Sequence, residues 1–107
     1  MNISNLRREY AHDGLRRADL HDDPYDQFNN WFEQACNADI IDPNAMSLAT
    51  ASADGHPTLR TVLLKYYDRE GFVFFTNLES TKARQIAQNS NVSLLFPWLA
   101  LDRQIII

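Results

Sequence analysis

The residues best suited to chemistry lie between Thr58 and Gln85, where cations and hydroxyl groups are spread along one stretch. The cations are Arg60, Lys65, Lys82 and Arg84, and the hydroxyl side chains are those of Thr76, Ser80 and Thr81. Ser80 precedes a helical pattern, and the free N–H groups and dipole at a helix start favour a bound anion. This stretch therefore predicts a phosphate-binding site.

Metal and nucleophile chemistry find no support in the residue pattern. His12, His21 and His56 lie far apart and lack the spacing of metal ligands. No sequence feature gives Cys36 a catalytic base, so we interpret it as a small residue near a helix end. The three glycines form no phosphate loop. The residues predict no metal site and identify no catalytic group.

The composition of the chain indicates one folded domain. It has 107 residues, of which 45% are hydrophobic, and a net charge of −4, which argues against a general nucleic-acid or membrane-surface binder. No apolar run is long enough to cross a bilayer, and the first ten residues lack the apolar core of a signal peptide. One cysteine fits a reducing compartment. We expect a cytoplasmic protein with neither a nucleic-acid nor a membrane partner.

A β-hairpin must position the first two cations. Residues 46–52 predict a strand, and Ala53–Asp54–Gly55 predicts the turn that leads into a longer strand over Thr58–Tyr67. Strict alternation places Arg60, Val62, Leu64 and Tyr66 on one face, and Leu59, Thr61, Leu63 and Lys65 on the other. Arg60 and Lys65 then point to opposite faces unless a bulge intervenes. This favours two anions on two faces over a single one.

The remaining cations belong to a helix that follows a second hairpin. Asp68–Gly71 predicts the turn, residues 72–76 a strand, and Ser80 the N-cap of a helix over about residues 81–88. Two further strands are expected, one over Val92–Trp98 that Pro97 breaks and one that begins at Arg103.

Residues 1–23 are polar and contain few apolar side chains, so two interpretations stay open. One is a mobile arm with solvated charges, with a short helix over Ser4–Ala11 possible; the other is a lid whose Arg7, Arg8 and Tyr10 close over an anionic ligand. A clear helix follows, capped by Asp22 or Asp23 with Pro24 at its first position. Its apolar stripe, formed by Phe28, Trp31, Phe32 and Ala35, is assigned to core packing.

The order of these elements predicts a mainly β fold with flanking helices, a small barrel or roll over residues 24–107. The chain finishes on the apolar, β-prone residues Ile105, Ile106 and Ile107. Because an unpaired apolar edge recruits other chains, we expect a fragment of a longer protein. The alternative is a last strand that is paired inside the sheet.

Several separated motifs resemble those of the pyridoxamine 5'-phosphate oxidase family. They include LRREY (6–10), RTVLLK (60–65), FFTN.ES.KA.Q (74–85), VSLLFPW (92–98) and RQ (103–104). In order and spacing they cover nearly the whole chain. The resemblance implies an FMN-binding split β-barrel, incomplete in this chain, that works as a homodimer with FMN at the subunit interface. It also implies oxidation of pyridoxine or pyridoxamine 5'-phosphate to pyridoxal 5'-phosphate, with O2 reduced to H2O2.

The same resemblance implies roles for individual residues. Arg60 would pair with the FMN phosphate, the backbone of Thr61, Val62, Leu63 and Leu64 would run beside the flavin, and Lys65 would serve both flavin and substrate phosphate. Phe75 and Thr76 match a second flavin contact, Lys82 a phosphate ligand, and Gln104 a side chain that bonds the flavin ring from the partner strand. Arg7, Arg8, Glu9 and Tyr10 match an arm that covers the substrate. Without the resemblance, Lys82 and Arg84 are a solvated helix face, Phe75 is core, and Gln104 is an edge residue.

Two departures from the family qualify these roles. Members commonly have Ser-Arg-Lys where this chain has Ser80, Thr81 and Lys82, so one arginine that pairs with phosphate is missing. The second half of the family, which supplies most substrate-phosphate contacts, is also absent. The leading hypothesis is therefore the N-terminal half of such an oxidase. Two alternatives remain, a non-catalytic flavin- or phosphate-binding module that dimerises and a degenerate fragment without cofactor.

Overall fold

A computed structural model describes residues 1–10 and 14–107 and shows a short list of elements after an irregular N-terminal segment. In chain order they are η1 (Arg17–Asp19), α1 (Pro24–Asn37), β1 (Ala45–Ala51), β2 (Pro57–Asp68), β3 (Gly71–Phe74), α2 (Thr81–Gln88), β4 (Ser93–Trp98), η2 (Leu99–Leu101) and β5 (Arg103–Ile106). Residues 1–10 form no helix, only a turn in which Leu6 N–H donates to the Ile3 carbonyl at 2.9 Å. Ala11, the last residue of the possible helix, lies outside the described residues.

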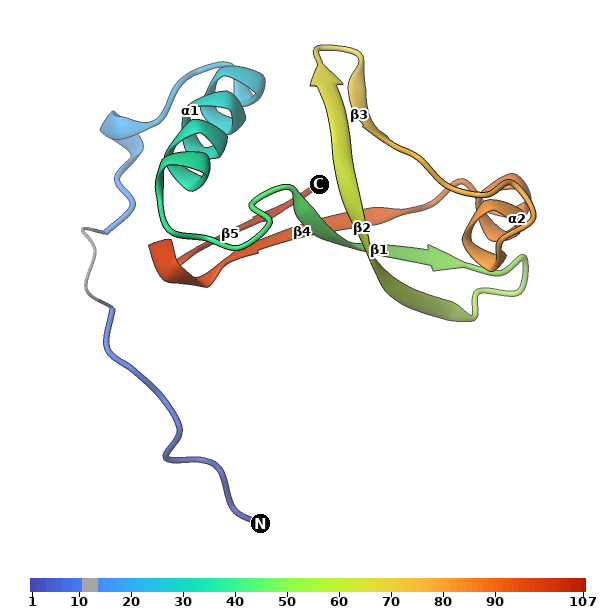
Figure 1. The fold of residues 1–107 in the computed structure, drawn as a ribbon, viewed down its shortest axis with the longest axis horizontal. Coiled ribbons are helices and arrows are strands. Elements are labelled where there is room, and N and C mark those ends of the chain that lie inside the picture. Colours follow the sequence, from blue (N-terminus) through green and yellow to red (C-terminus); the bar gives the residue numbers. More distant parts are fainter. Residues whose placement is uncertain (11–13) are drawn as a thin grey trace.

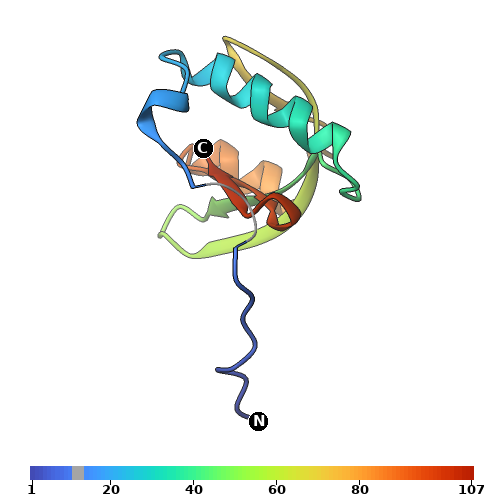
Figure 2. The same ribbon diagram turned by 90° about the vertical axis from the view of Figure 1, so that its left-hand side faces the viewer.

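The five strands form one antiparallel sheet in the order β3-β2-β1-β4-β5. The sheet curls, with α1 crossing one face and α2 at the opposite end of the strands (Figures 1 and 2). Its two edges, β3 and β5, are not paired with each other among the described residues, so the barrel is open. This confirms the expected fold, a mainly β split barrel with flanking helices that is incomplete in this chain.

The core lies between α1 and the face of the sheet that it covers. Phe28 is its centre, with ring centroids 4.9 Å from those of Tyr67 and Phe72 and 5.3 Å from that of Phe96. The buried core residues are Phe28, Ala35, Met46, Leu48, Val62, Leu64, Leu94, Phe96 and Trp98. Truncation of a buried aromatic ring to alanine costs about 3–5 kcal/mol. The apolar stripe predicted for this helix is thus confirmed as packing surface.

Helix α1 starts where its capping residues predict. The Asp23 side chain accepts a hydrogen bond from Tyr25 N–H at 2.8 Å, and Pro24 takes the first helical position, where its missing N–H leaves no bond unmade. Of the two capping candidates, the structure selects Asp23. No helix in the described part of the chain is long and apolar enough to span a membrane.

Strand β2 carries a bulge that changes the predicted alternation. Leu64 pairs with Phe74, but the next pair joins Tyr66 to Val73, so Lys65 is an extra residue without a partner in β3. Beyond this point Tyr67 turns toward the core, whereas Tyr66 is 59% exposed. The assignment of Tyr66 to the face of Val62 was therefore wrong, while the assignment of Arg60 to that face is correct.

Strand β4 continues through Pro97, which contradicts the predicted break. β4 pairs with β1 only over Ser93–Leu95, so at Pro97 only the β5 side carries a partner, Gln104. A proline lacks the N–H that a central strand must donate, and a strand with one open side tolerates that loss. Trp98 follows in a buried position, where its indole N–H donates to the Pro43 carbonyl at 2.9 Å.

Candidate functional site

Arg60 lies at the centre of a polar network on the face of the sheet that also carries the core. Its Nη1 group donates to Thr50 Oγ1 at 2.7 Å and to the Leu48 carbonyl at 3.2 Å. Its Nη2 group donates to Thr58 Oγ1 at 2.6 Å. Thr50 and Thr58 are directly opposite each other in β1 and β2, so their two hydroxyls together accept hydrogen bonds from the Nη1 and Nη2 groups of Arg60.

The opposite edge of the Arg60 guanidinium is left for a ligand. A guanidinium has five N–H donors, and three bonds reach protein acceptors here, two from Nη1 and one from Nη2. Among the described residues, Nε and the second N–H of Nη2 have no acceptor and no carboxylate pairs with Arg60. These two groups form one edge of the fork, and that edge matches two oxygens of a phosphate or carboxylate.

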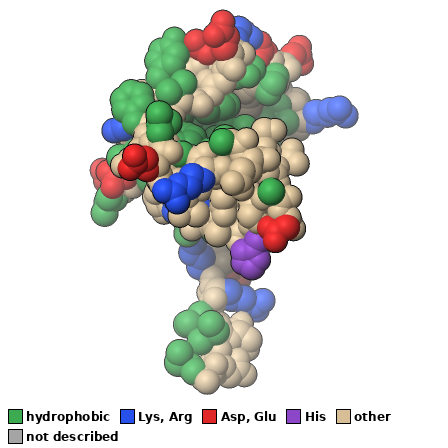
Figure 3. Space-filling view, turned by 90° about the vertical axis from the view of Figure 1, so that its right-hand side faces the viewer, with side chains coloured by type: hydrophobic (Ala, Val, Ile, Leu, Met, Phe, Trp, Pro, Cys, Tyr) green, Lys and Arg blue, Asp and Glu red, His purple; other side chains and the backbone are tan. Residues whose placement is uncertain are grey.

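A second group of predicted site residues lies at the start of α2. Ser80 is its N-cap, accepting from Ala83 N–H at 3.3 Å, and the Thr76 hydroxyl lies 3.3 Å from the Ser80 hydroxyl. Lys82 in the first turn is half-buried, and Thr81 is exposed. The helix spans the eight residues that the sequence predicts. Figure 3 shows this end of the molecule, where Lys or Arg side chains and Asp or Glu side chains both reach the surface and hydrophobic side chains gather toward the top.

The cations between Thr58 and Gln85 have no ion pair except for Arg69, and outside that stretch Arg8 is the one cation among the described residues with an ion pair. The ion pairs of the described residues join Arg8 to Asp102 and Arg69 to both Asp23 and Asp26. Arg60, Lys65, Lys82 and Arg84 take part in none of them. A group of cations without carboxylate partners leaves its positive charge available to an external anion.

The backbone of β2 offers hydrogen bonds along one side. β3 pairs with β2 only from Leu64 onward, so over Pro57–Leu63 the strand has β1 on one side and no strand on the other among the described residues. Unpaired N–H and C=O groups on such an edge are available to hydrogen-bond a neighbouring chain or ligand. The edge runs between the face that carries Arg60 and the face that carries Lys65.

Lys65 lies on the outer side of the sheet, away from Arg60. It is exposed at the bulge, and Thr61 and Leu63 of the same strand are exposed on that side too. Val62 and Leu64 bury their side chains in the core, and the Leu64 backbone N–H and C=O are both hydrogen-bonded to Asn44. The structure thus places Arg60 and Lys65 on opposite faces, as the alternation predicts for these two residues.

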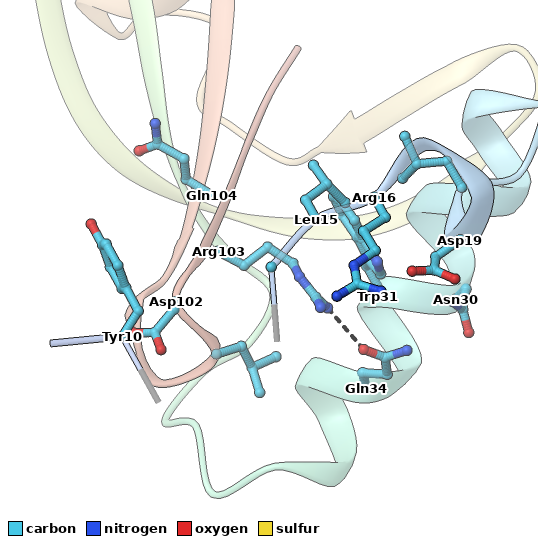
Figure 4. Close-up of a pocket in the computed structure, with 13 residues that line it drawn as sticks. Tyr10, Leu15, Arg16, Asp19, Asn30, Trp31, Gln34, Asp102, Arg103 and Gln104 are labelled. Atoms are coloured by element: carbon cyan, nitrogen blue, oxygen red, sulfur yellow. Dashed lines mark hydrogen bonds between the residues drawn. The ribbon is translucent and has the colours of Figure 1, made fainter. Parts of the chain in front are cut away.

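Two further predicted residues are open to solvent. Phe75 follows β3 and its side chain is 75% exposed, which contradicts a place in the core and leaves the ring available for contact. Gln104 is exposed on β5, opposite Pro97, and points away from Trp31 and Arg16 (Figure 4). The structure does not bring Gln104 next to Arg60, because β1 and β4 separate their strands.

The N-terminal segment, residues 1–10, contacts the turn between β4 and β5 through Arg8. Its guanidinium donates to the Leu99 carbonyl and lies 2.6 Å from Asp102 Oδ1, in the turn between β4 and β5. Asp102 has left-handed backbone angles, with φ 52°, at the end of that turn. Arg7, Glu9 and Tyr10 are exposed. The predicted arm residues are therefore near β5 and remote from the α2 end.

A cavity of about 470 Å³ lies between this segment, α1 and β5 (Figure 4). Tyr10, Arg16, Trp31 and Arg103 are among its lining residues. The Arg103 guanidinium stacks 4.4 Å from the Trp31 ring centroid and donates to Gln34 Oε1 at 2.8 Å. Burial lowers the pKa of Arg103 from its ordinary value. Arg103 is thus already stacked and hydrogen-bonded, whereas Arg16 at the rim of this cavity is exposed.

No group of three or more potential ligands is close enough to hold a metal ion among the described residues. His12 lies outside them. Cys36 is free and exposed on α1.

Sequence reasoning missed the side chains that orient Arg60. Thr50, Thr58 and Gln85 contribute the contacts, yet all three are polar residues of kinds that are common on surfaces. One signal was available for the threonines, since a hairpin turn at 53–55 places Thr50 opposite Thr58 two residues from Arg60. Gln85 gave no such signal because its contact depends on how α2 packs.

A model of the family described as pyridoxamine 5'-phosphate oxidase matches residues 32–107. An enzyme named pyridoxine/pyridoxamine 5'-phosphate oxidase from Rippkaea orientalis is 61% identical over 105 residues, covering 98% of this chain and 50% of the relative. An enzyme of the same name from Yersinia enterocolitica is 56% identical over 104 residues, which cover 97% of this chain and 48% of that relative. The chain spans about half the length of the curated relatives that it matches.

Solved structures agree in fold. PhzG from Burkholderia lata, in complex with tetrahydrophenazine-1-carboxylic acid, superposes with a TM-score of 0.82 at 30% identity, over 89% of this chain and 48% of that one. An FMN-binding protein from Nostoc punctiforme, related to pyridoxamine 5'-phosphate oxidase, superposes with a TM-score of 0.56 at 22% identity. The match covers 64% of this chain and 38% of that one. At that identity the second comparison concerns the fold alone.

Proposed function

The chain belongs to the pyridoxamine 5'-phosphate oxidase family, and on that basis we propose that it forms the FMN-binding half of a pyridoxine/pyridoxamine 5'-phosphate oxidase. The observation that carries the proposal is the open edge of Arg60. A half-buried guanidinium, oriented by two threonine hydroxyls and free of carboxylates among the described residues, can bind an anion from outside the chain.

The residues present fit the parts of FMN in turn. Arg60 would bind the phosphate with its Nε and Nη2 edge, and Lys82 and the N–H groups at the start of α2 would add positive potential. The unpaired edge of β2 would hydrogen-bond the flavin ring through the backbone of residues 61–63, with Leu64 next to it at the end of this edge. Thr76 and the exposed Phe75 would line the far side of the cofactor, at the beginning of the loop that leads to α2.

The substrate would lie on the other side of the strand. When bound, FMN supplies the redox chemistry, accepting a hydride from the substrate and passing the electrons to O2 to give H2O2. Lys65, on the outer face, would bind the substrate phosphate and stay close to the flavin edge. Arg7, Arg8, Glu9 and Tyr10 would cover the substrate, which requires Arg8 to leave Asp102. No residue of this chain is assigned as a general acid or base.

A second copy of the chain would complete the cofactor site. The outer face of the sheet carries the exposed apolar side chains of Leu59, Leu63 and Ile106, a pattern typical of a surface that another protein covers. Gln104 lies on the same outer face and is remote from Arg60 of its own chain. In a homodimer, Gln104 would instead reach the flavin held by the partner. The proposed location is the cytoplasm, which suits a single free cysteine.

A second candidate function is a flavin-binding module without turnover. The observation in its favour is length, because the chain spans about half of its relatives and the resemblance assigns most substrate-phosphate contacts to the other half. In this reading, FMN binds as above and the module dimerises, but pyridoxamine 5'-phosphate is not oxidised.

Reconstitution with FMN tests both candidates. The purified chain is incubated with FMN, desalted, and examined for flavin absorbance near 450 nm and for pyridoxal 5'-phosphate formation in air. We expect bound flavin, and turnover in addition if the oxidase half acts alone. Flavin without product would favour the module, and neither signal would overturn both candidates.

Matched charge removals locate the phosphate. Arg60→Ala should weaken FMN binding at least tenfold, because it removes a bidentate, charge-assisted contact. Arg84→Ala removes the same charge from an exposed position on α2 and should change the dissociation constant by less than about threefold. Equal losses in the two variants would show a general charge effect and contradict the assignment of Arg60.

A further inference from the structure

Gln85 connects α2 to the two strands that carry the Arg60 network. Its Oε1 atom accepts from Thr50 Oγ1 at 2.6 Å and from Thr58 Oγ1 at 2.5 Å. The threonines face each other across β1 and β2, and Thr50 is only 2% exposed. One amide oxygen from α2 therefore accepts hydrogen bonds from both hydroxyls that in turn accept from Arg60.

The direction of these hydrogen bonds is fixed by the donors. Each threonine hydroxyl has one proton, and Arg60 can only donate, so the hydroxyl oxygens must accept from Arg60. Their protons then need an acceptor, and in this buried place Gln85 Oε1 accepts both. With its amide nitrogen turned inward instead, Gln85 would offer a further donor to oxygens that already accept from a cation. The network therefore runs one way, from Arg60 through the threonines to Gln85.

This arrangement determines which edge of Arg60 is presented. Because Thr50 and Thr58 are aligned by Gln85, they fix the plane of the guanidinium and keep the Nε and Nη2 edge outward. Without the acceptor, the threonine protons would compete for the Leu48 carbonyl or for each other's oxygen, which is 3.1 Å away. Arg60 would then lose the geometry that a bidentate contact needs.

We infer that Gln85 is a positioning residue for phosphate recognition, acting through Thr50 and Thr58 to orient Arg60 toward the FMN phosphate. The inference rests on the proposed function, because it needs Arg60 to bind that phosphate. It also makes α2 responsible for two parts of the site, the helix start that faces the anion and the amide that aligns the main arginine.

A purely structural role for Gln85 makes a different prediction. If Gln85 only attached α2 to the sheet, its loss would loosen the whole site and weaken every flavin to the same extent. A positioning role affects only ligands with a phosphate. Riboflavin has the flavin ring and ribityl chain of FMN without the phosphate, so the comparison of the two separates the roles.

The test measures dissociation constants for FMN and riboflavin by quenching of flavin fluorescence. Gln85→Leu removes the acceptor at similar side-chain volume. It should raise the dissociation constant of FMN at least tenfold and change that of riboflavin by less than about twofold. Gln88→Leu, an exposed position on the same helix, should change neither constant. If Gln85→Leu does not fold, Thr58→Val takes its place, because it removes one hydroxyl of the network and leaves the Gln85 side chain itself unchanged. It should give the same phosphate-dependent loss of affinity.

A double-mutant cycle with Arg60→Ala decides how Gln85 acts. In the Arg60→Ala background, Gln85→Leu should no longer weaken FMN binding, because the group that it positions is gone. An unchanged effect there, or equal losses for FMN and riboflavin, would overturn the inference. If Arg60→Ala alone left FMN affinity unaltered, the proposed phosphate site itself would be wrong. If Arg60→Ala weakened FMN and Gln85→Leu did not, only the positioning role would be wrong.

Discussion

Arg60 differs from its neighbouring cations in what surrounds it. Lys65 and Arg84 extend into solvent, where their charge is screened and their side chains have many conformations. Arg60 is half-buried and bonded through three donors, so much of the entropy cost of ordering it is met before any ligand arrives. A preorganised arginine of this kind is the residue that dominates recognition of a phosphate.

Thr81 is the residue at which the family resemblance implies a different side chain. It occupies the first position of α2, exposed beside the proposed phosphate, where the family resemblance expects an arginine. We expect Thr81→Arg to tighten FMN binding about tenfold, because an ion pair with phosphate adds roughly 1–3 kcal/mol where water is partly excluded. The dissociation constant is measured by fluorescence quenching in parallel with riboflavin, whose affinity should not change. No gain for FMN would mean that the phosphate does not reach the start of α2.

At the scale of elements, the bulge in β2 is what arranges the strand for two tasks. Before the bulge, the residues at alternate positions from Thr58 to Leu64 face the core, and after it Tyr67 does. The extra residue, Lys65, thereby stays outside while the strand keeps packing against Phe28 through Tyr67. A bulge re-aims the side chains that follow it, which here are those of Tyr66 and Tyr67.

Helix α1 depends on Asp23, whose carboxylate caps the first turn and pairs with Arg69. The hydrogen bond from Arg69 and then that from Tyr25 N–H lower the pKa of Asp23 below its ordinary value of 3.8. The unfolded chain thus binds this proton more readily than the folded one, so the stabilisation is present above about pH 4 and is lost as pH falls through the lowered pKa.

We therefore expect Asp23→Ala to lower the thermal midpoint by a few degrees near neutral pH, since it removes a helix cap. The difference from the unmodified chain should shrink in urea titrations as pH falls toward about 3. Asp22→Ala, one residue earlier and outside the cap, serves as control and should change little. A difference that stays constant down to that pH would contradict a role for the ionised carboxylate.

At the scale of the whole molecule, the open sheet leaves two surfaces that a larger assembly would cover. One is the outer face, with Leu59, Leu63 and Ile106 exposed. The other is an apolar groove of about 320 Å³ between α1, β3 and the last strand, lined by Tyr25, Phe72 and residues 105–107 among others. Apolar surface in both places makes association favourable.

The outer face gives a prediction on oligomeric state. Leu59 is exposed opposite Ala49, and a glutamate there would bury an unpaired charge in a homodimer. We expect Leu59→Glu to raise the dimer dissociation constant at least tenfold in light-scattering chromatography and to weaken FMN binding with it. Ile41→Glu, an even more exposed apolar position between α1 and β1, should leave both unchanged. A monomeric unmodified chain, or a dimer insensitive to Leu59→Glu, would contradict this assembly.

Local signals in the sequence predicted most of the elements. Capping side chains, turn glycines and apolar periodicity are short-range properties, so α1, α2 and both hairpins begin and end close to their predicted residues. The family motifs are equally local and identified the oxidase family before any fold was known. The opposite faces of Arg60 and Lys65 also followed from alternation alone.

Features that depend on distant partners were decided by the tertiary structure. The bulge that turns Tyr67 inward follows from the register of β3, and the continuation of β4 through Pro97 follows from the short pairing with β1. Gln85 reaches Thr50 only because α2 packs against β1, 35 residues away in the chain. A sequence pattern carries side-chain type and spacing, whereas the direction of a hydrogen-bond network depends on which side chains folding brings into contact. The cations of the phosphate site were thus evident in the sequence, and their orientation was set by the fold.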